Sequence, residues 1–168
     1  MNLGMIIPCL IRKPAFLCAS VLLLIVSTLG CDFIATSHFH TNSPTVEHVQ
    51  KCRALMYIRP GVKLQPLGYS HQQGLDDSIR FKFSVADLNP AEIFEAEFVD
   101  ADKLAPDFNR SLSEVGVDLS WWNQSEKDVW GASFSVPARG MQGTRGLEIA
   151  YQPDADDSTV FYVLWFET

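Results

Sequence analysis

The sequence predicts a single small α+β domain: a four- to five-stranded, largely antiparallel sheet with one or two helices on one face. Two observations lead to this fold class. Apolar residues alternate along several stretches, as in half-buried strands, whereas only two stretches carry helical start signals. We expect this domain to span residues 44–168, behind a cleaved signal helix over residues 1–30 and a tether over residues 31–43. The 138 residues that follow the first 30 suit one domain with a sizeable core.

Two stretches predict helices. Residues 43–61 offer Ser43 as the N-cap and Pro44 at the first helical position, and a proline and a glycine close the stretch. Residues 89–104 begin with an asparagine cap, a proline and an early glutamate, which predicts a second, short helix. The first helix has an apolar face at three-to-four spacing, formed by Val46, Val49, Cys52, Leu55 and Met56.

Several stretches predict strands. The clearest alternates Ile79, Phe81, Phe83 and Val85 with polar residues. The last run, Val160 to Phe166, is apolar on both faces, so we expect it in the centre of the sheet with a cover on each side. The predicted strands are residues 63–70, residues 79–85, residues 129–138 and a hairpin over residues 147–168, with a turn over residues 71–77.

The N-terminus has the features of a secretory signal. Arg12 and Lys13 precede an uncharged run from Ala15 to Gly30. As a helix this run would span about 24 Å, short of the roughly 30 Å of a hydrocarbon core. A cleaved signal therefore fits better than a permanent span, and an uncleaved signal anchor is the alternative.

The residues at the end of this run, STLGC (27–31), resemble the lipobox of bacterial lipoproteins. Leu29 and Gly30 fit the positions before the cysteine, whereas Thr28 stands where that class prefers leucine. The resemblance covers residues 1–31 only. It implies that Cys31 receives a diacylglycerol, that the chain is cut before it, and that its new amino group is acylated, for example with palmitate. Ordinary cleavage that leaves a free Cys31 is a further alternative.

The resemblance also bears on location. An aspartate directly after the lipidated cysteine resembles the signal that retains a lipoprotein in the inner membrane, and Asp32 occupies that position. We therefore expect a membrane anchor through lipid on Cys31, with the domain outside the cytoplasm, in the periplasm. The inner (plasma) membrane is favoured over the outer membrane.

The charge and the cysteines exclude some functions. Only two of the 13 basic residues and none of the 20 acidic ones lie in residues 1–30. The mature chain therefore has 11 basic and 20 acidic residues and a net charge of −9. That charge repels nucleic acid, which we do not expect as a partner. Besides Cys31, the mature chain has Cys52 as its other cysteine, so we expect no internal disulfide. We expect the Cys52 side chain to be buried as a small apolar group.

No candidate catalytic or metal site is complete in the sequence. Ser70 and His71 are adjacent and would point to opposite faces of a strand, and no known catalytic motif is present. We therefore predict no catalytic residue, no metal and no cofactor. The groups weighed were the histidines His38, His40 and His48, the turn aspartates Asp154, Asp156 and Asp157, the pair Asp76 and Asp77, and the glutamates Glu92, Glu95 and Glu97.

The tryptophans are the remaining candidate. Trp121, Trp122 and Trp130 lie within ten residues, among polar side chains. Neighbouring residues of an extended segment cannot both enter one core face, so one of the first two is a candidate for exposure. Exposed tryptophan is enriched at protein contacts. The three residues are thus a possible interaction surface, and the alternative is that both neighbours pack.

Together these features predict a membrane-anchored lipoprotein of the bacterial cell envelope. Its domain would be a non-enzymatic binding or structural module with an envelope protein as a possible partner. A small-ligand carrier or sensor with an apolar pocket is the first alternative. A hydrolase with an unrecognised site is the second.

Overall fold

The chain divides into two units, Met1–Ala35 and Thr36–Thr168, and we describe the second in a computed structural model. The described residues are 37–74, 77–86, 89–108, 121–122, 128–140, 142–154 and 158–167. The predicted signal, Cys31 and Asp32 lie outside them. Within these ranges no helix is both long enough and apolar enough to cross a membrane.

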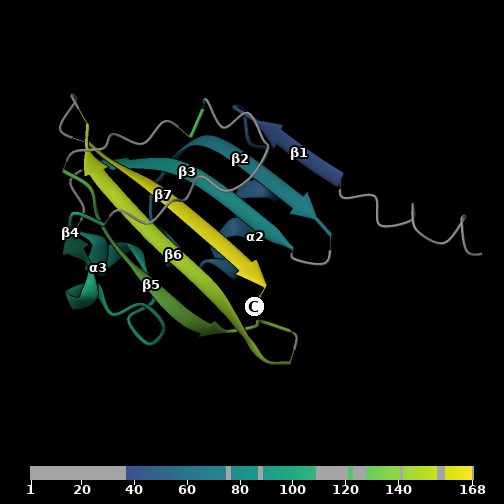
Figure 1. The fold of residues 1–168 in the computed structure, drawn as a ribbon. Helices are drawn as coiled ribbons and strands as arrows, with labels where there is room; N and C mark the ends of the chain where they lie inside the picture. The colour runs from purple at the N-terminus through teal and green to yellow at the C-terminus, as the bar shows by residue number, and fades with distance from the viewer. Residues whose placement is uncertain are drawn as a thin grey trace, which may run out of the picture. The chain divides into compact units, whose positions relative to one another are not determined.

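The domain is an open, seven-stranded antiparallel sheet with two short helices (Figure 1). The order of the strands across the sheet is β1-β2-β3-β7-β6-β5-β4, and every pair is antiparallel. The strands are β1 (Ser37–Thr41), β2 (Gln65–Gln73), β3 (Ser78–Ala86), β4 (Ala105–Pro106), β5 (Trp130–Pro137), β6 (Thr144–Pro153) and β7 (Ser158–Glu167). The helices are α2 (Val46–Leu55) and α3 (Pro90–Ile93), and Ala101–Lys103 forms a 3₁₀ turn.

The single domain and the antiparallel sheet are confirmed, but the predicted four or five strands are too few. The fold is mostly β rather than α+β, because β1 and β4, which were not predicted, add to the sheet and both helices are short. β4 has only two residues, too few to show alternation. β1 lies within residues 31–43, which were predicted as a tether because most of them are polar. Four of the five residues of β1 are exposed.

The predicted central place of the last strand is confirmed. β7 is the fourth of seven strands and lies between β3 and β6. Phe161 and Val163, which are fully buried, belong to the core on the helix side of the sheet. Val160 and Tyr162 alternate with them and belong to a second cluster on the other side. A strand with apolar side chains on both faces is stable only where both faces are covered.

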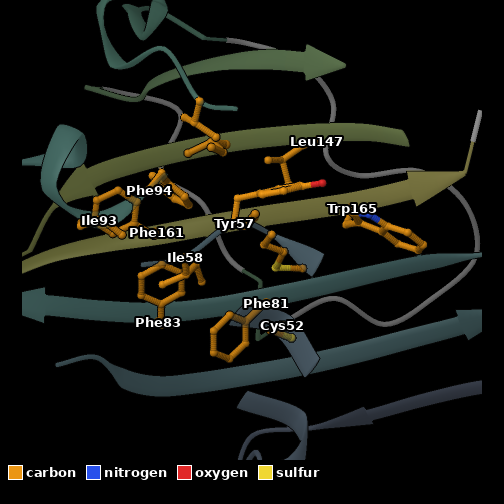
Figure 2. Packing of buried hydrophobic residues seen from close by; sticks show 14 of the residues in the cluster. Cys52, Tyr57, Ile58, Phe81, Phe83, Ile93, Phe94, Leu147, Phe161 and Trp165 are labelled. Atoms are coloured by element: carbon orange, nitrogen blue, oxygen red, sulfur yellow. The ribbon is translucent and has the colours of Figure 1, made fainter. Parts of the chain in front are cut away.

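On the helix side, α2 lies behind the sheet and α3 lies beside β4 and β5 (Figure 1), and both helices bury residues in the core. Side chains from β3, β7 and β6 meet those of the helices and their connections in one layer, in which Phe81, Phe161 and Phe94 are labelled in Figure 2. Cys52 is fully buried in this layer, as predicted, and burial raises the pKa of its thiol far above the ordinary value. Such a thiol is a packing group and a poor nucleophile.

On the opposite side of the sheet, the described residues of the connection between β4 and β5 cover the central strands. Trp122 and Val129 from this connection are buried against Ala150, Val160 and Tyr162 of the central strands. Phe108 and Trp121 pack at the border of the same cluster. The sheet is therefore the middle of three layers over its central strands.

Both helices end earlier than predicted, and α2 also begins at a different cap. The N-cap of α2 is Thr45 rather than Ser43, because Thr45 and His48 form a reciprocal capping box. Val46 was expected on the buried face, but it is 72% exposed. α3 begins with the predicted Asn89 cap but ends at Ile93. Phe94 is extended there and bridges to Ile58, so a tertiary strand contact replaces the next helical turn.

Candidate functional site

The two edges of the sheet differ in how they are protected. Edge strands carry unpaired backbone groups that can pair with another chain, and proteins commonly guard them with short strands, proline or charge. β4 is two residues long and includes Pro106. β1 has five residues, none of them proline, lysine, arginine, aspartate or glutamate, and four of the five are exposed. Among the described residues, β1 is therefore an open edge along its whole length, whereas at the other edge β4 pairs with Trp130 and Gly131 of β5 only.

One side of this edge is apolar and aromatic. Phe39 is 51% exposed, and its ring centroid lies 5.5 Å from that of His48 and 6.2 Å from that of Tyr69. The His48 and Tyr69 rings stack at 4.2 Å with an interplanar angle of 7°. Tyr69 is buried, so it fixes the two more exposed rings to the domain. An exposed aromatic side chain thus stands on the open strand on a rigid support.

The other side of the edge starts a row of rings, which we call the aromatic row: His38, His40, Trp121, Trp122 and Tyr162. His38 stacks on His40 at 6.3 Å, and His40 stacks on Trp121 at 6.4 Å. Trp121 meets Trp122 edge-on at 5.2 Å, and Trp122 meets Tyr162 edge-on at 5.3 Å. Edge-to-face contact at such spacing is favourable for aromatic rings. The row links β1 to the central strand β7.

The predicted tryptophan surface is not one surface. Trp121 and Trp122 lie together in the aromatic row, Trp121 half-buried and Trp122 buried. Trp130 is 40% exposed and stacks on Tyr151, which in turn stacks on Phe161 of the helix-side core. The sheet therefore separates Trp130 from the other two. Neither of the two neighbours is exposed, and both pack in one cluster, which is the alternative that the sequence left open.

A lysine joins the aromatic row to the sheet. The Nζ of Lys82 donates a hydrogen bond to the Trp121 carbonyl oxygen at 2.9 Å and lies 5.1 Å from the centre of the Tyr162 ring. Burial lowers the pKa of Lys82, and the charge of Asp154 acts in the opposite direction. Burial, with a further contribution from Asp154, raises the pKa of Tyr162 to about 12. The Lys82 hydrogen bond holds the Trp121 backbone in place beside the neutral Tyr162 phenol.

The structure also forms a serine–histidine pair that the sequence did not reveal. The His38 Nε2 and Ser70 Oγ atoms are 3.2 Å apart. They come from β1 and β2, where His40 rather than His38 stands directly opposite Ser70. Ser70 is fully buried, so its hydroxyl is not accessible to a substrate in this conformation. The pair is suited to joining β1 to β2. It could not be predicted because the strand that carries His38 was itself not predicted.

The adjacent Ser70 and His71 do point to opposite faces, as expected for a strand. His71 instead pairs with Asp77, with 2.8 Å between Nε2 and Oδ1. This contact closes the turn between β2 and β3. Asp76, the other member of the predicted carboxylate pair, lies outside the described residues.

The remaining candidates have local structural roles. Glu92 accepts a hydrogen bond from the Asn89 N–H in the cap of α3, and Glu95 pairs with Arg139 at 2.5 Å. Glu97 is exposed. Asp154 follows β6, whereas Asp156 and Asp157 lie outside the described residues. Among the residues that the structure describes, no three potential metal ligands come together.

No protein-family model, no curated protein and no solved structure matches this chain. The interpretation of the site therefore depends on the residues themselves. The feature that stands out is the open strand β1, with an exposed aromatic ring on one face and paired histidines on the other.

The contact between Trp121 and Gly68 can be tested by substitution. A Cβ at Gly68 would lie 2.3 Å from the nearest atom of the Trp121 ring, so Gly68→Ala must displace the ring. We expect a loss of about 1–3 kcal/mol in the free energy of unfolding, measured by urea denaturation. The loss should shrink when Trp121→Ala is already present. An equal loss in both backgrounds would contradict this packing.

The His38 environment predicts a dependence on pH. Burial, then His40 and Arg80, lower the pKa of His38 from 6.5. The unfolded chain therefore takes up this proton more readily, and the stability that depends on neutral His38 is present above pH 6.5 and lost as the pH falls below it. Between about pH 7.5 and about pH 5.5, the native chain should lose more unfolding free energy than His38→Gln. Equal losses in the two proteins would contradict this assignment.

Proposed function

We propose that the protein is a bacterial lipoprotein that is anchored to the membrane through lipid on Cys31, and that its domain is a non-enzymatic binding or structural module of the cell envelope. The observation that carries this proposal is the position of the open edge. β1 begins at Ser37, six residues after the cysteine of the lipobox-like motif. The strand most able to accept a partner is therefore the part of the domain next to the anchor.

Chain length supports an arrangement close to the membrane. Six residues reach at most about 20 Å when fully extended. A thioether-linked diacylglycerol provides two acyl chains, which hold a protein stably at about 0.8 kcal/mol for each buried CH₂ group. An anchored domain would thus keep β1 within a short distance of the headgroups, where other envelope proteins are concentrated.

The charge of the mature chain favours a protein partner. A net charge of −9 is repelled by anionic lipid and by nucleic acid, so contact with either through a broad surface is disfavoured. β1 itself carries no charged residue when its histidines are neutral. An extended strand of another envelope protein could pair with it through backbone hydrogen bonds without that repulsion. Asp32 favours the inner membrane as the site, with the domain in the periplasm.

The proposal predicts the mass and location of the expressed protein. The native chain should begin at Cys31 with an added diacylglycerol and fractionate with membranes, whereas Cys31→Ala should lack that mass. Intact mass spectrometry and membrane fractionation measure both. Cys18→Ala is the matched control, because residue 18 would leave with the signal and the mature mass would be unchanged. A native chain that keeps residues 1–30 unmodified would overturn the lipoprotein assignment.

A further inference from the structure

We infer that the open edge pairs with a second copy of this chain, β1 against β1 in antiparallel orientation, with Phe39 facing Phe39 on a two-fold axis. This inference names the partner of the binding edge and rests on the proposed function for that edge. A continuous sheet would then run through both copies. The pairing is isologous, the commonest symmetry among protein dimers.

The sequence of β1 is nearly the same in both directions. It reads Ser-His-Phe-His-Thr, so reversal about Phe39 exchanges His38 with His40 and a serine with a threonine. In an antiparallel pair centred on Phe39, His38 would stand opposite His40 of the second copy, and Ser37 opposite Thr41. Each residue would therefore meet its own kind or a close equivalent. This self-complementarity favours a second copy over an unrelated strand.

The side chains support the same register. Phe39 is 51% exposed and is supported by Tyr69 and His48, so it presents an aromatic surface beside the open edge without rearrangement. Directly opposite aromatic residues on neighbouring strands are a stabilising cross-strand pair. On the other face the four histidine rings would lie side by side, and neutral histidines carry no repulsion.

The opposite edge is built differently, because β4 pairs with only Trp130 and Gly131 of β5. β4 is two residues long and contains Pro106, which cannot donate a backbone hydrogen bond. Pairing of β1 with β1 uses the same edge of both copies, so this isologous contact closes at two. A closed dimer, rather than a growing sheet, is the expected assembly.

Anchoring would help such a pair to form. Both copies carry β1 six residues after Cys31, so two anchored domains present their edges at the same height above the bilayer. A two-fold axis along the membrane normal keeps both anchors in one leaflet. A five-residue edge buries much less area than a standard protein interface of about 1,600 Å², so its intrinsic affinity is weak. Confinement to the membrane raises the effective concentration of one copy at the other and so favours the pair.

Disulfide trapping in membranes tests this register. Residues directly opposite in an antiparallel pair have Cα atoms about 4.5–5.5 Å apart, a spacing that a disulfide spans. We would co-express Ser37→Cys and Thr41→Cys as full chains with tags of different size, oxidise the isolated membranes mildly, and quantify dimers on a non-reducing gel. A mixed dimer should form from the co-expressed pair, several-fold above either single variant and above the unsubstituted chain.

Two further substitutions provide the controls. Phe39→Lys places a charge at the two-fold axis and should abolish the mixed dimer. Val46→Lys should leave it unchanged, because Val46 is the more exposed of the two side chains, at 72%, and lies on α2 rather than on β1. Equal yields from the single variants, or a dimer that survives Phe39→Lys, would overturn the pairing.

The mass of the same samples separates this inference from the proposed anchor. A lipidated chain without a mixed dimer would overturn the pairing and leave the anchor intact. A mixed dimer from an unlipidated chain would support the pairing and overturn the anchor. A chain with neither property would overturn both.

Discussion

The structure depends on a strand that is apolar on both faces. Phe161 and Val163 point to one side of β7, and Val160 and Tyr162 to the other, and all four are buried. Burying such a strand requires two neighbouring strands and two covering layers. β3 and β6 provide the neighbours, the helices cover one face, and Trp122 and Val129 cover part of the other. The core is therefore centred on β7, far in sequence from the proposed N-terminal anchor.

This arrangement leaves the proposed binding edge at the margin of the fold. β1 pairs along one side with β2 and contributes little to the central layers. It can therefore present Phe39 and the histidines to a partner without exposing the core. Trp121 connects the two regions, because it packs on Gly68 and His40 at the edge and on Trp122 farther in. A partner at β1 would thus contact residues that the core already holds in place.

Much of the core could be predicted because alternation and buried apolar runs are local signals. β3, β5 and the β6–β7 hairpin follow the predicted ranges closely, and the Asn89 cap was recognisable from its neighbours. The rest depends on tertiary contacts. The polar residues of β1 resemble a tether until β2 lies beside them, and α3 stops where Phe94 bridges to Ile58. The separation of Trp130 from Trp121 requires knowledge of the sheet between them.

Amide hydrogen exchange on the full chain, read by mass spectrometry in dilute detergent solution, tests most directly whether β7 is the centre of this fold. Protection reports the free energy of local or global opening, so doubly covered strands should exchange last. We expect the slowest exchange in β7, Ser158–Glu167. Of the strands with three or more residues, β1, Ser37–Thr41, should exchange fastest. Fast exchange in β7, or protection in β1 as strong as in β7, would contradict this account.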